Sequence, residues 1–101
     1  MKHDFKVDNS QVVVRLSEAL TFSDHGAFRD VLKNVIASNA KTCVFDLSML
    51  DSVDSAGLGM FMIASEELGK QNWKMVLRSP RGQVKQLLDL AKIKDVVTVE
   101  G

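Results

Sequence analysis

The feature that most limits the possible folds of this chain is an apolar run, Thr42–Leu47, followed by a short acidic loop and a helix. The run is rich in strand-forming residues, and its nearly continuous apolar character predicts burial on both faces, as in a parallel sheet. After the loop, either Asp54 or Ser55 can cap a helix over Ala56–Leu68. This unit places the Ser55 hydroxyl at the carboxyl end of a strand, the edge where α/β domains usually bind their ligands.

The remaining apolar patterns divide the chain into short strands and amphipathic helices, without repeats or linkers. We predict strands at Phe5–Val7, Gln11–Leu16, Thr42–Leu47, Trp73–Leu77 and Val96–Val99, and helices at Asp24–Ser38, at Ala56–Leu68 with Gly69 as its C-cap, and from Ser79-Pro80 onward. The order is β-β-α-β-α-β-α-β, and right-handed crossovers make the later strands parallel. We therefore predict a single α/β domain over residues 1–101, with a mixed, mostly parallel sheet and about three packed helices.

The composition is that of an ordinary globular domain, with 46% hydrophobic and 26% charged residues. A formal net charge of zero argues against a general attraction to nucleic acid or anionic lipid. We expect no signal peptide and no direct membrane insertion, because the longest apolar run, Ala56–Ala64, is shorter than the roughly 20 residues of a spanning helix. The single cysteine, Cys43, fits a reducing cytosol, so we expect a cytoplasmic protein without a metal cluster.

Ser55 is the residue that most invites a functional interpretation. A serine at a helix start is most often only a cap. A phosphate on Ser55, however, would meet free backbone N–H groups of the helix together with repulsion from Asp51 and Asp54. Gly57 and Gly59 in the first turn cost roughly 1 kcal/mol each relative to alanine, so a close approach must compensate. Either a binding partner or tight helix–sheet packing could supply that approach, and the residues alone leave both open.

The hexapeptide Asp54-Ser55-Ala56-Gly57-Leu58-Gly59 resembles the D-S-[SAT]-G-L-G signature of STAS domains, the family of bacterial anti-sigma factor antagonists. The resemblance covers nearly the whole chain. It includes the strand segments Val12–Ser17, Val44–Leu47 and Lys74–Leu77, and the helical segment Val84–Leu88. One stretch departs from the family pattern: where antagonists often carry Gly-x-Leu-Asp, this chain has Glu18-Ala19-Leu20-Thr21, so Thr21 replaces the aspartate.

This resemblance implies a phosphorylation switch with Ser55 as the acceptor. The kinase would be a partner anti-sigma factor with a GHKL-type ATPase fold, and a PP2C-type phosphatase would remove the phosphate. The unmodified protein would bind the anti-sigma factor, and the phosphorylated protein would release it. The resemblance and the residues around Ser55 together place the partner-binding surface at Thr21, Asp51, Asp54, Ala56, Gly57, Leu58, Gly59 and Met60. The domain is expected to bring no cofactor and no catalytic group of its own.

Two other functions stay open. Some small STAS proteins are subunits bound to the ATPase of lipid-transport ABC systems, but these often have threonine at the position of Ser55. A small-ligand-binding STAS domain is the other alternative, and the sequence shows no distinctive pocket for it. Serine hydrolysis has no support, because no Gly-x-Ser-x-Gly elbow surrounds Ser55. The segment Met60–Ile63 spans more than one helical face, which predicts some exposed apolar side chains suited to docking.

Overall fold

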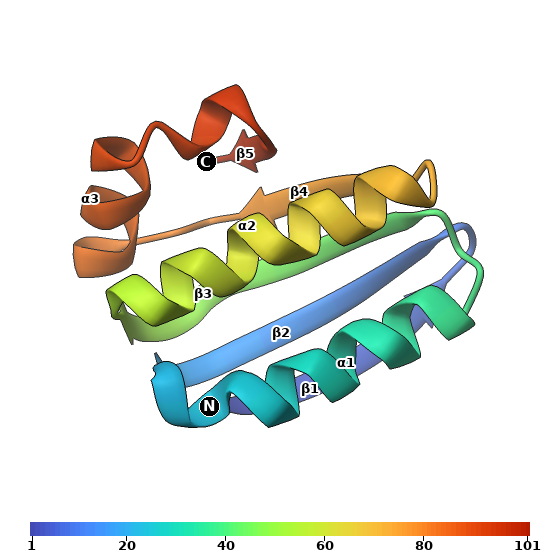
Figure 1. The fold of residues 1–101 in the computed structure, drawn as a ribbon, viewed down its shortest axis with the longest axis horizontal. Helices are drawn as coiled ribbons and strands as arrows, with labels where there is room; N and C mark the ends of the chain where they lie inside the picture. The colour runs from blue at the N-terminus through green and yellow to red at the C-terminus, as the bar shows by residue number, and fades with distance from the viewer.

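The computed structural model describes residues 1–101, whose five strands form one sheet in the order β1-β2-β3-β4-β5 (Figure 1). β1 is antiparallel to β2, and the later neighbours are parallel, which confirms the mixed, mostly parallel sheet. The strands are β1 (Lys2–Asp8), β2 (Gln11–Leu20), β3 (Thr42–Val53), β4 (Lys74–Arg78) and β5 (Thr98–Glu100). The helices are α1 (His25–Ala37), α2 (Ser55–Lys70) and α3 (Gly82–Leu90), with short 3₁₀ turns η1 (Phe22–Asp24) and η2 (Ile93–Asp95).

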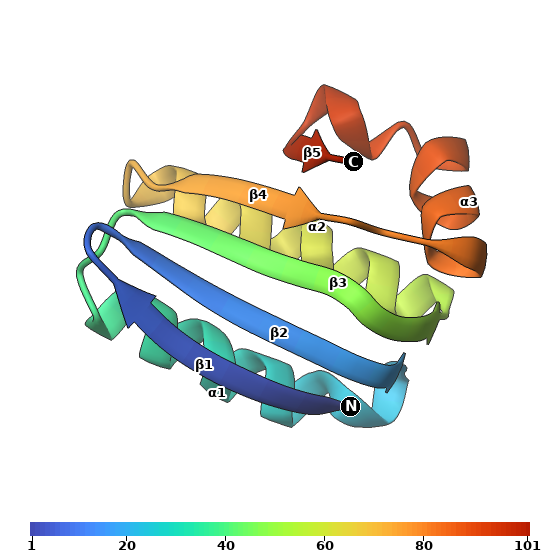
Figure 2. The same ribbon diagram turned by 180° about the vertical axis from the view of Figure 1, so that it is seen from behind.

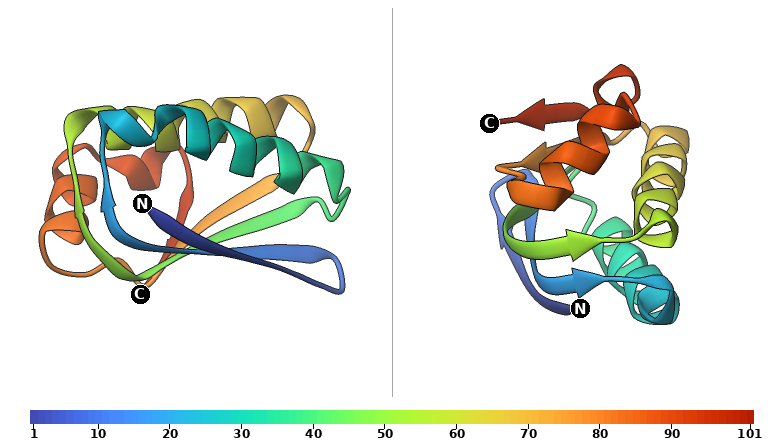
Figure 3. Two further views of the ribbon diagram at one scale, coloured as in Figure 1. Left: turned by 90° about the horizontal axis from the view of Figure 1, so that it is seen from below. Right: turned by 90° about the vertical axis from the view of Figure 1, so that its left-hand side faces the viewer.

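The core lies between the sheet and two helices, α1 and α2, which run side by side along one of its faces (Figure 3). Phe28 of α1, Phe45 of β3 and Phe61 of α2 meet there, with ring centroids 5.6 to 6.0 Å apart. Such spacings are those of favourable aromatic pairs, and the three rings join both helices to the central strand. α3 lies apart from these helices, near the carboxyl ends of β3 and β4 (Figure 1), and its Val84 and Leu88 are buried in the same core.

The opposite face of the sheet carries no helix (Figure 2). Val44 and Val76 point to this face, because side chains alternate along a strand, yet they are only 1% and 3% exposed. Val44 pairs with Val13 on one side and with Val76 on the other, so an apolar row crosses the middle of the sheet. The predicted burial of β3 on both faces therefore holds for Val44, although neighbouring strands and not a helix layer provide it.

β3 is longer than the sequence pattern suggests, and this changes the description of the site. The strand continues to Val53, and its partner β2 continues to Leu20, through two shifts of register. Leu47, Leu50 and Val53 are buried at every third position, a spacing that departs from simple strand alternation where the register with β2 shifts. The predicted loop between β3 and α2 was wrong in length, because only Asp54 separates the two elements.

Two predicted helix boundaries also differ from the structure. Gly69 lies inside α2 and is not its cap, since the helix continues to Lys70 and Gln71 follows as C-cap. α3 begins at Gly82 and not at Ser79-Pro80, because Ser79 adopts the left-handed conformation with φ 56°. A helix-capping residue has an extended backbone, which Arg81 adopts and Ser79 does not, so Arg81 is the N-cap of α3.

The start of α2 as a candidate functional site

Asp54 is the capping residue at the start of α2. Its Oδ1 accepts a hydrogen bond of 2.7 Å from the Gly57 N–H, which satisfies one of the free donors of the first helical turn. Ser55 is the first residue of the helix and is exposed. The choice between Asp54 and Ser55 as cap is thus settled in favour of Asp54, and the Ser55 hydroxyl has no capping role.

The same carboxylate also ties α2 to the end of β2. Its Oδ2 accepts a hydrogen bond of 3.2 Å from the Phe22 N–H in η1. The Asp54 N–H in turn donates to the Leu20 carbonyl, also at 3.2 Å. Asp54 therefore joins the start of α2 to the turn that follows β2, and both segments border Ser55.

The two glycines of the signature have different structural roles. Gly57 is buried, and a Cβ built on it would lie 2.5 Å from the Leu20 carbonyl oxygen. No real side chain tolerates that approach, so packing within the domain explains Gly57. Gly59 has nothing within 4 Å of an added Cβ. Packing inside the domain therefore gives no reason for a glycine at position 59.

The remaining predicted surface residues of α2 divide into accessible and buried ones. Ala56 and Leu58 are half-buried and border Ser55. Met60 is only 3% exposed and belongs to the core. Position 60 lies on the side of α2 that faces the core, so Met60 reaches the surface only through the groove between α1 and α2. Met62 and Ile63 remain about half exposed, at 46% and 53%.

Thr21 lies in the turn that follows β2 and stabilises that turn. Its N–H donates to Asp24 Oδ2 at 2.8 Å, and its hydroxyl lies 2.9 Å from Ser23 Oγ. Burial alone would raise the pKa of Asp24, but the hydrogen bond from the Thr21 N–H and the N-terminal ammonium outweigh it and lower the pKa. Thr21 is thus in hydrogen-bond contact with a carboxylate, that of Asp24.

Arg81, the N-cap of α3, and Gln83 in its first turn make contacts that the sequence did not predict. Arg81 donates to Asp51 Oδ1 at 2.9 Å and also to the Ser48 carbonyl, so the Asp51 charge has a cationic partner. Gln83 uses its side-chain amide as a strand would use its backbone: it accepts from the Val53 N–H at 3.0 Å and donates to the Val53 carbonyl at 2.9 Å. No local sequence signal marks Gln83, because its partner is 30 residues away.

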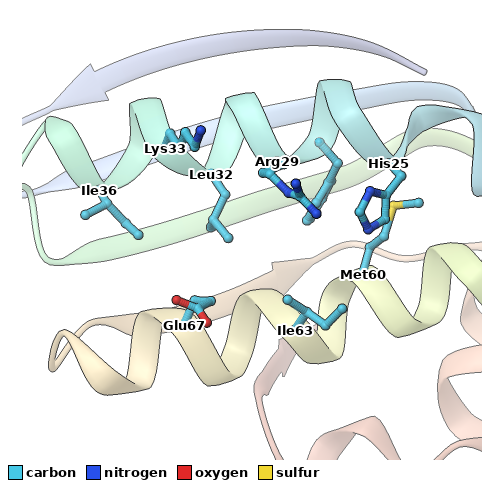
Figure 4. A pocket seen from close by; sticks show the side chains of 9 residues that line it. His25, Arg29, Leu32, Lys33, Ile36, Met60, Ile63 and Glu67 are labelled. Atoms are coloured by element: carbon cyan, nitrogen blue, oxygen red, sulfur yellow. The ribbon is translucent and has the colours of Figure 1, made fainter.

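A groove of about 380 Å³ lies between α1 and α2 (Figure 4). Its apolar lining comes from Phe28, Leu32, Ile36, Met60 and Ile63. Its polar side chains come from both helices, with His25, Arg29 and Lys33 on α1 and Glu67 on α2 (Figure 4). This groove was not predictable from the sequence, because its two walls come from separate helices.

None of the helices is both long and apolar enough to span a membrane.

Comparison with known proteins identifies the domain type. The family model of the STAS domain matches residues 2–101. No curated protein matches the chain in sequence. A candidate anti-sigma factor antagonist from Thermotoga maritima has a similar structure, with a TM-score of 0.88 at 19% identity, covering 98% of this chain and 86% of that one.

Two further solved structures are similar over most of their length. The phosphorylated form of the Bacillus cell-fate determinant SpoIIAA gives a TM-score of 0.74 at 19% identity, covering 97% of this chain and 90% of that one. A sulfate transporter family protein from Wolinella succinogenes gives 0.77 at 15% identity, covering 94% and 80%. At these identities the likeness concerns the fold.

Proposed function

Because this chain belongs to the STAS domain family, we propose that it is an anti-sigma factor antagonist that exchanges partners through phosphorylation of Ser55. In this proposal the unphosphorylated protein binds, in the cytoplasm, an anti-sigma factor that is also a GHKL-type serine kinase. Phosphorylation by that kinase releases the protein, and a PP2C-type phosphatase restores the binding form. The protein itself is a ligand and a substrate, and not an enzyme.

The observation that carries the proposal is the exposure of Ser55 at the first position of α2, beside a carboxylate that already caps the helix. A kinase can reach a hydroxyl in this position without unfolding the helix. The Gly57 N–H is occupied by Asp54, but the N–H groups of Ser55 and Ala56 precede any intrahelical acceptor. They and the positive end of the helix dipole would stabilise an added phosphate.

The expected effect of the phosphate is a large change in binding with a small change in folding. Phosphorylation adds about −1.5 to −2 charges at pH 7. The helix start favours this charge and the Asp54 carboxylate opposes it, so the two effects on the fold partly cancel. A partner packed over Ala56, Leu58 and Gly59 would instead have to desolvate a dianion. A loss of a few kcal/mol is enough, since each 1.4 kcal/mol is a factor of about ten in affinity.

The other proposed partner-binding residues take supporting places around Ser55. Asp51, paired with Arg81, and Thr21, in the turn after β2, form the margin of the surface. Gly57 acts through packing, by letting α2 approach Leu20. Met60 can meet a partner only through the groove that it lines.

A STAS subunit bound to the ATPase of a lipid-transport ABC system is the second candidate. A sulfate transporter family protein has a similar fold, so the fold alone does not favour the switch over this candidate. The serine at position 55 and the full Gly-Leu-Gly sequence support the switch instead. The groove between α1 and α2 gives a location for a small ligand, should the domain bind one.

Size-exclusion chromatography of reconstituted mixtures distinguishes the two candidates. The unphosphorylated protein is mixed with the kinase-like protein encoded nearest its gene and, separately, with an ABC ATPase from the same genome. Co-elution with the kinase alone is the expected result. A stable complex with the ATPase, and none with the kinase, would overturn the switch in favour of the transporter subunit.

A further inference from the structure

Phe22 is the most exposed aromatic residue of the chain, with 74% of its surface accessible. It is the first residue of η1, the short turn that lies between β2 and α1. Its N–H donates to Asp54 Oδ2 at 3.2 Å, which places its backbone next to the residue that precedes Ser55. A large apolar side chain is thus held open to solvent beside the proposed phosphoacceptor.

The turn that carries Phe22 is fixed on both sides. The Asp24 N–H donates to the Thr21 carbonyl at 2.9 Å, and the Thr21 N–H donates back to Asp24 Oδ2 at 2.8 Å. Together with the bond to Asp54, these contacts hold the backbone of η1 before any partner arrives. An aromatic side chain on a preorganised backbone loses little conformational freedom when it becomes buried in an interface.

Other apolar side chains surround Ser55 on the same side of α2. Leu58 and Met62 follow Ser55 at intervals of three and seven residues, which puts them on one helical face. Leu58 is half-buried and Met62 is 46% exposed. Gly59, with open space above it, lies between them. Leu58 and Met62 thus form an apolar patch on the Ser55 side of α2. The hydrogen bond from the Phe22 N–H to Asp54 places the backbone of Phe22 at the start of the same helix.

We propose that Phe22 is the aromatic anchor by which the unphosphorylated protein docks on its kinase partner, with Asp54 as the residue that positions it. This inference rests on the proposed function and adds the chemistry of the partner: an apolar pocket next to the site of phosphate transfer. The pocket must adjoin the ATP site of the kinase, because the Ser55 hydroxyl has to reach the γ-phosphate while Phe22 is bound. Aromatic residues are prominent among the side chains that dominate interface affinity.

Titration of the purified kinase with Phe22→Ala protein tests the inference. The variant should bind at least tenfold more weakly than wild type, whereas Leu90→Ala, whose side chain is 80% exposed at the last position of α3, should bind within about twofold. In phosphorylation assays the KM for Phe22→Ala should rise, and kcat at saturation should stay within about twofold. Phe22→Leu should fall between wild type and Phe22→Ala, and it serves if the alanine variant misfolds.

The outcomes separate the anchor from the proposed switch. If wild type binds and is phosphorylated, but Phe22→Ala binds equally well, the anchor is wrong and the switch stands. If the kinase neither binds nor phosphorylates wild type, both are wrong. Phe22-dependent dimerisation of the free protein, without any effect of Phe22→Ala on kinase binding, would make a second copy the occupant of the patch and overturn the anchor.

Discussion

Gly57 lies against the main chain of Leu20 so closely that a Cβ on it would be 2.5 Å from the Leu20 carbonyl oxygen. This approach brings the first turn of α2 against the end of β2, at the point where the Asp54 N–H donates to the same carbonyl. The proposed phosphoacceptor therefore lies beside a contact that any side chain at position 57 would force apart.

Gly57→Ala should destabilise the fold by about 1–3 kcal/mol, because the added methyl group overpacks a backbone contact that cannot easily move. Urea denaturation monitored by circular dichroism measures the change. Gly59→Ala is the matched control: its Cβ meets open space, so the better helix propensity of alanine should raise the stability by about 0.5–1 kcal/mol. Changes of the same sign in both variants would contradict the different roles given to the two glycines.

Gly59 should matter for binding and not for folding. We expect Gly59→Gln, with a larger side chain on the exposed side of α2, to fold normally and to bind the kinase at least about tenfold more weakly. Ser65→Gln, six residues farther along α2, is the control for a larger side chain away from Ser55. Isothermal titration calorimetry with the kinase measures both variants, and undiminished affinity of Gly59→Gln would remove Gly59 from the interface.

Gln83 should anchor the start of α3 to the end of β3. Its amide makes both a donor and an acceptor contact with Val53, so Gln83→Ala should lower the free energy of unfolding by about 1–2 kcal/mol. Gln86→Ala, on the same helix and also exposed, should change it by less than about 0.5 kcal/mol. Thermal unfolding of the two variants side by side makes the comparison, and equal midpoints would show that the Val53 contacts add no stability.

Asp46 should make the stability of the fold depend on pH in the acid range. Burial alone would raise the pKa of this carboxyl, but hydrogen bonding from Ser48 and the charges of Arg15 and Arg78 lower it below the ordinary value of 3.8. Because the pKa is lower in the folded state, the stabilisation is present above the unfolded pKa and is lost as the pH falls through the folded pKa.

The variant Asp46→Asn isolates this contribution. Wild type should be the more stable protein at pH 6–7, and the difference in unfolding free energy should shrink as the pH falls below about 4. Urea denaturation at a series of pH values gives the two curves. A difference that stays constant or widens on acidification would contradict the sign of the shift.

The order of strands and helices follows from periodicity, but the exact extent of β3 does not. Its last residues, Ser48–Val53, lack the strict alternation of a strand, and their polar members have the composition of a loop. Only the pairing with β2, through two shifts of register, reveals them as strand. Register shifts of this kind depend on contacts between segments far apart in the sequence, so a local pattern does not predict them.

Only the part of the candidate site that is formed by neighbouring residues could be predicted from the sequence. Asp54 and Ser55 are adjacent in the sequence, and a helix start limits the roles that they can have. Phe22 and Gln83 are 32 and 30 residues from their partners Asp54 and Val53, so only the fold brings them together. The sequence left two reasons open for the glycines, namely packing within the domain and contact with a partner. The space around an added Cβ assigns the first reason to Gly57.

Intact-mass spectrometry after incubation with ATP and the kinase-like protein encoded nearest the gene tests the central proposal most directly. Wild type should gain the mass of one phosphate, and Ser55→Ala should gain none while still binding the kinase. A phosphorylated Ser55→Ala protein would show that the acceptor is another residue. No phosphate on wild type, with the kinase active on ATP, would contradict the switch itself.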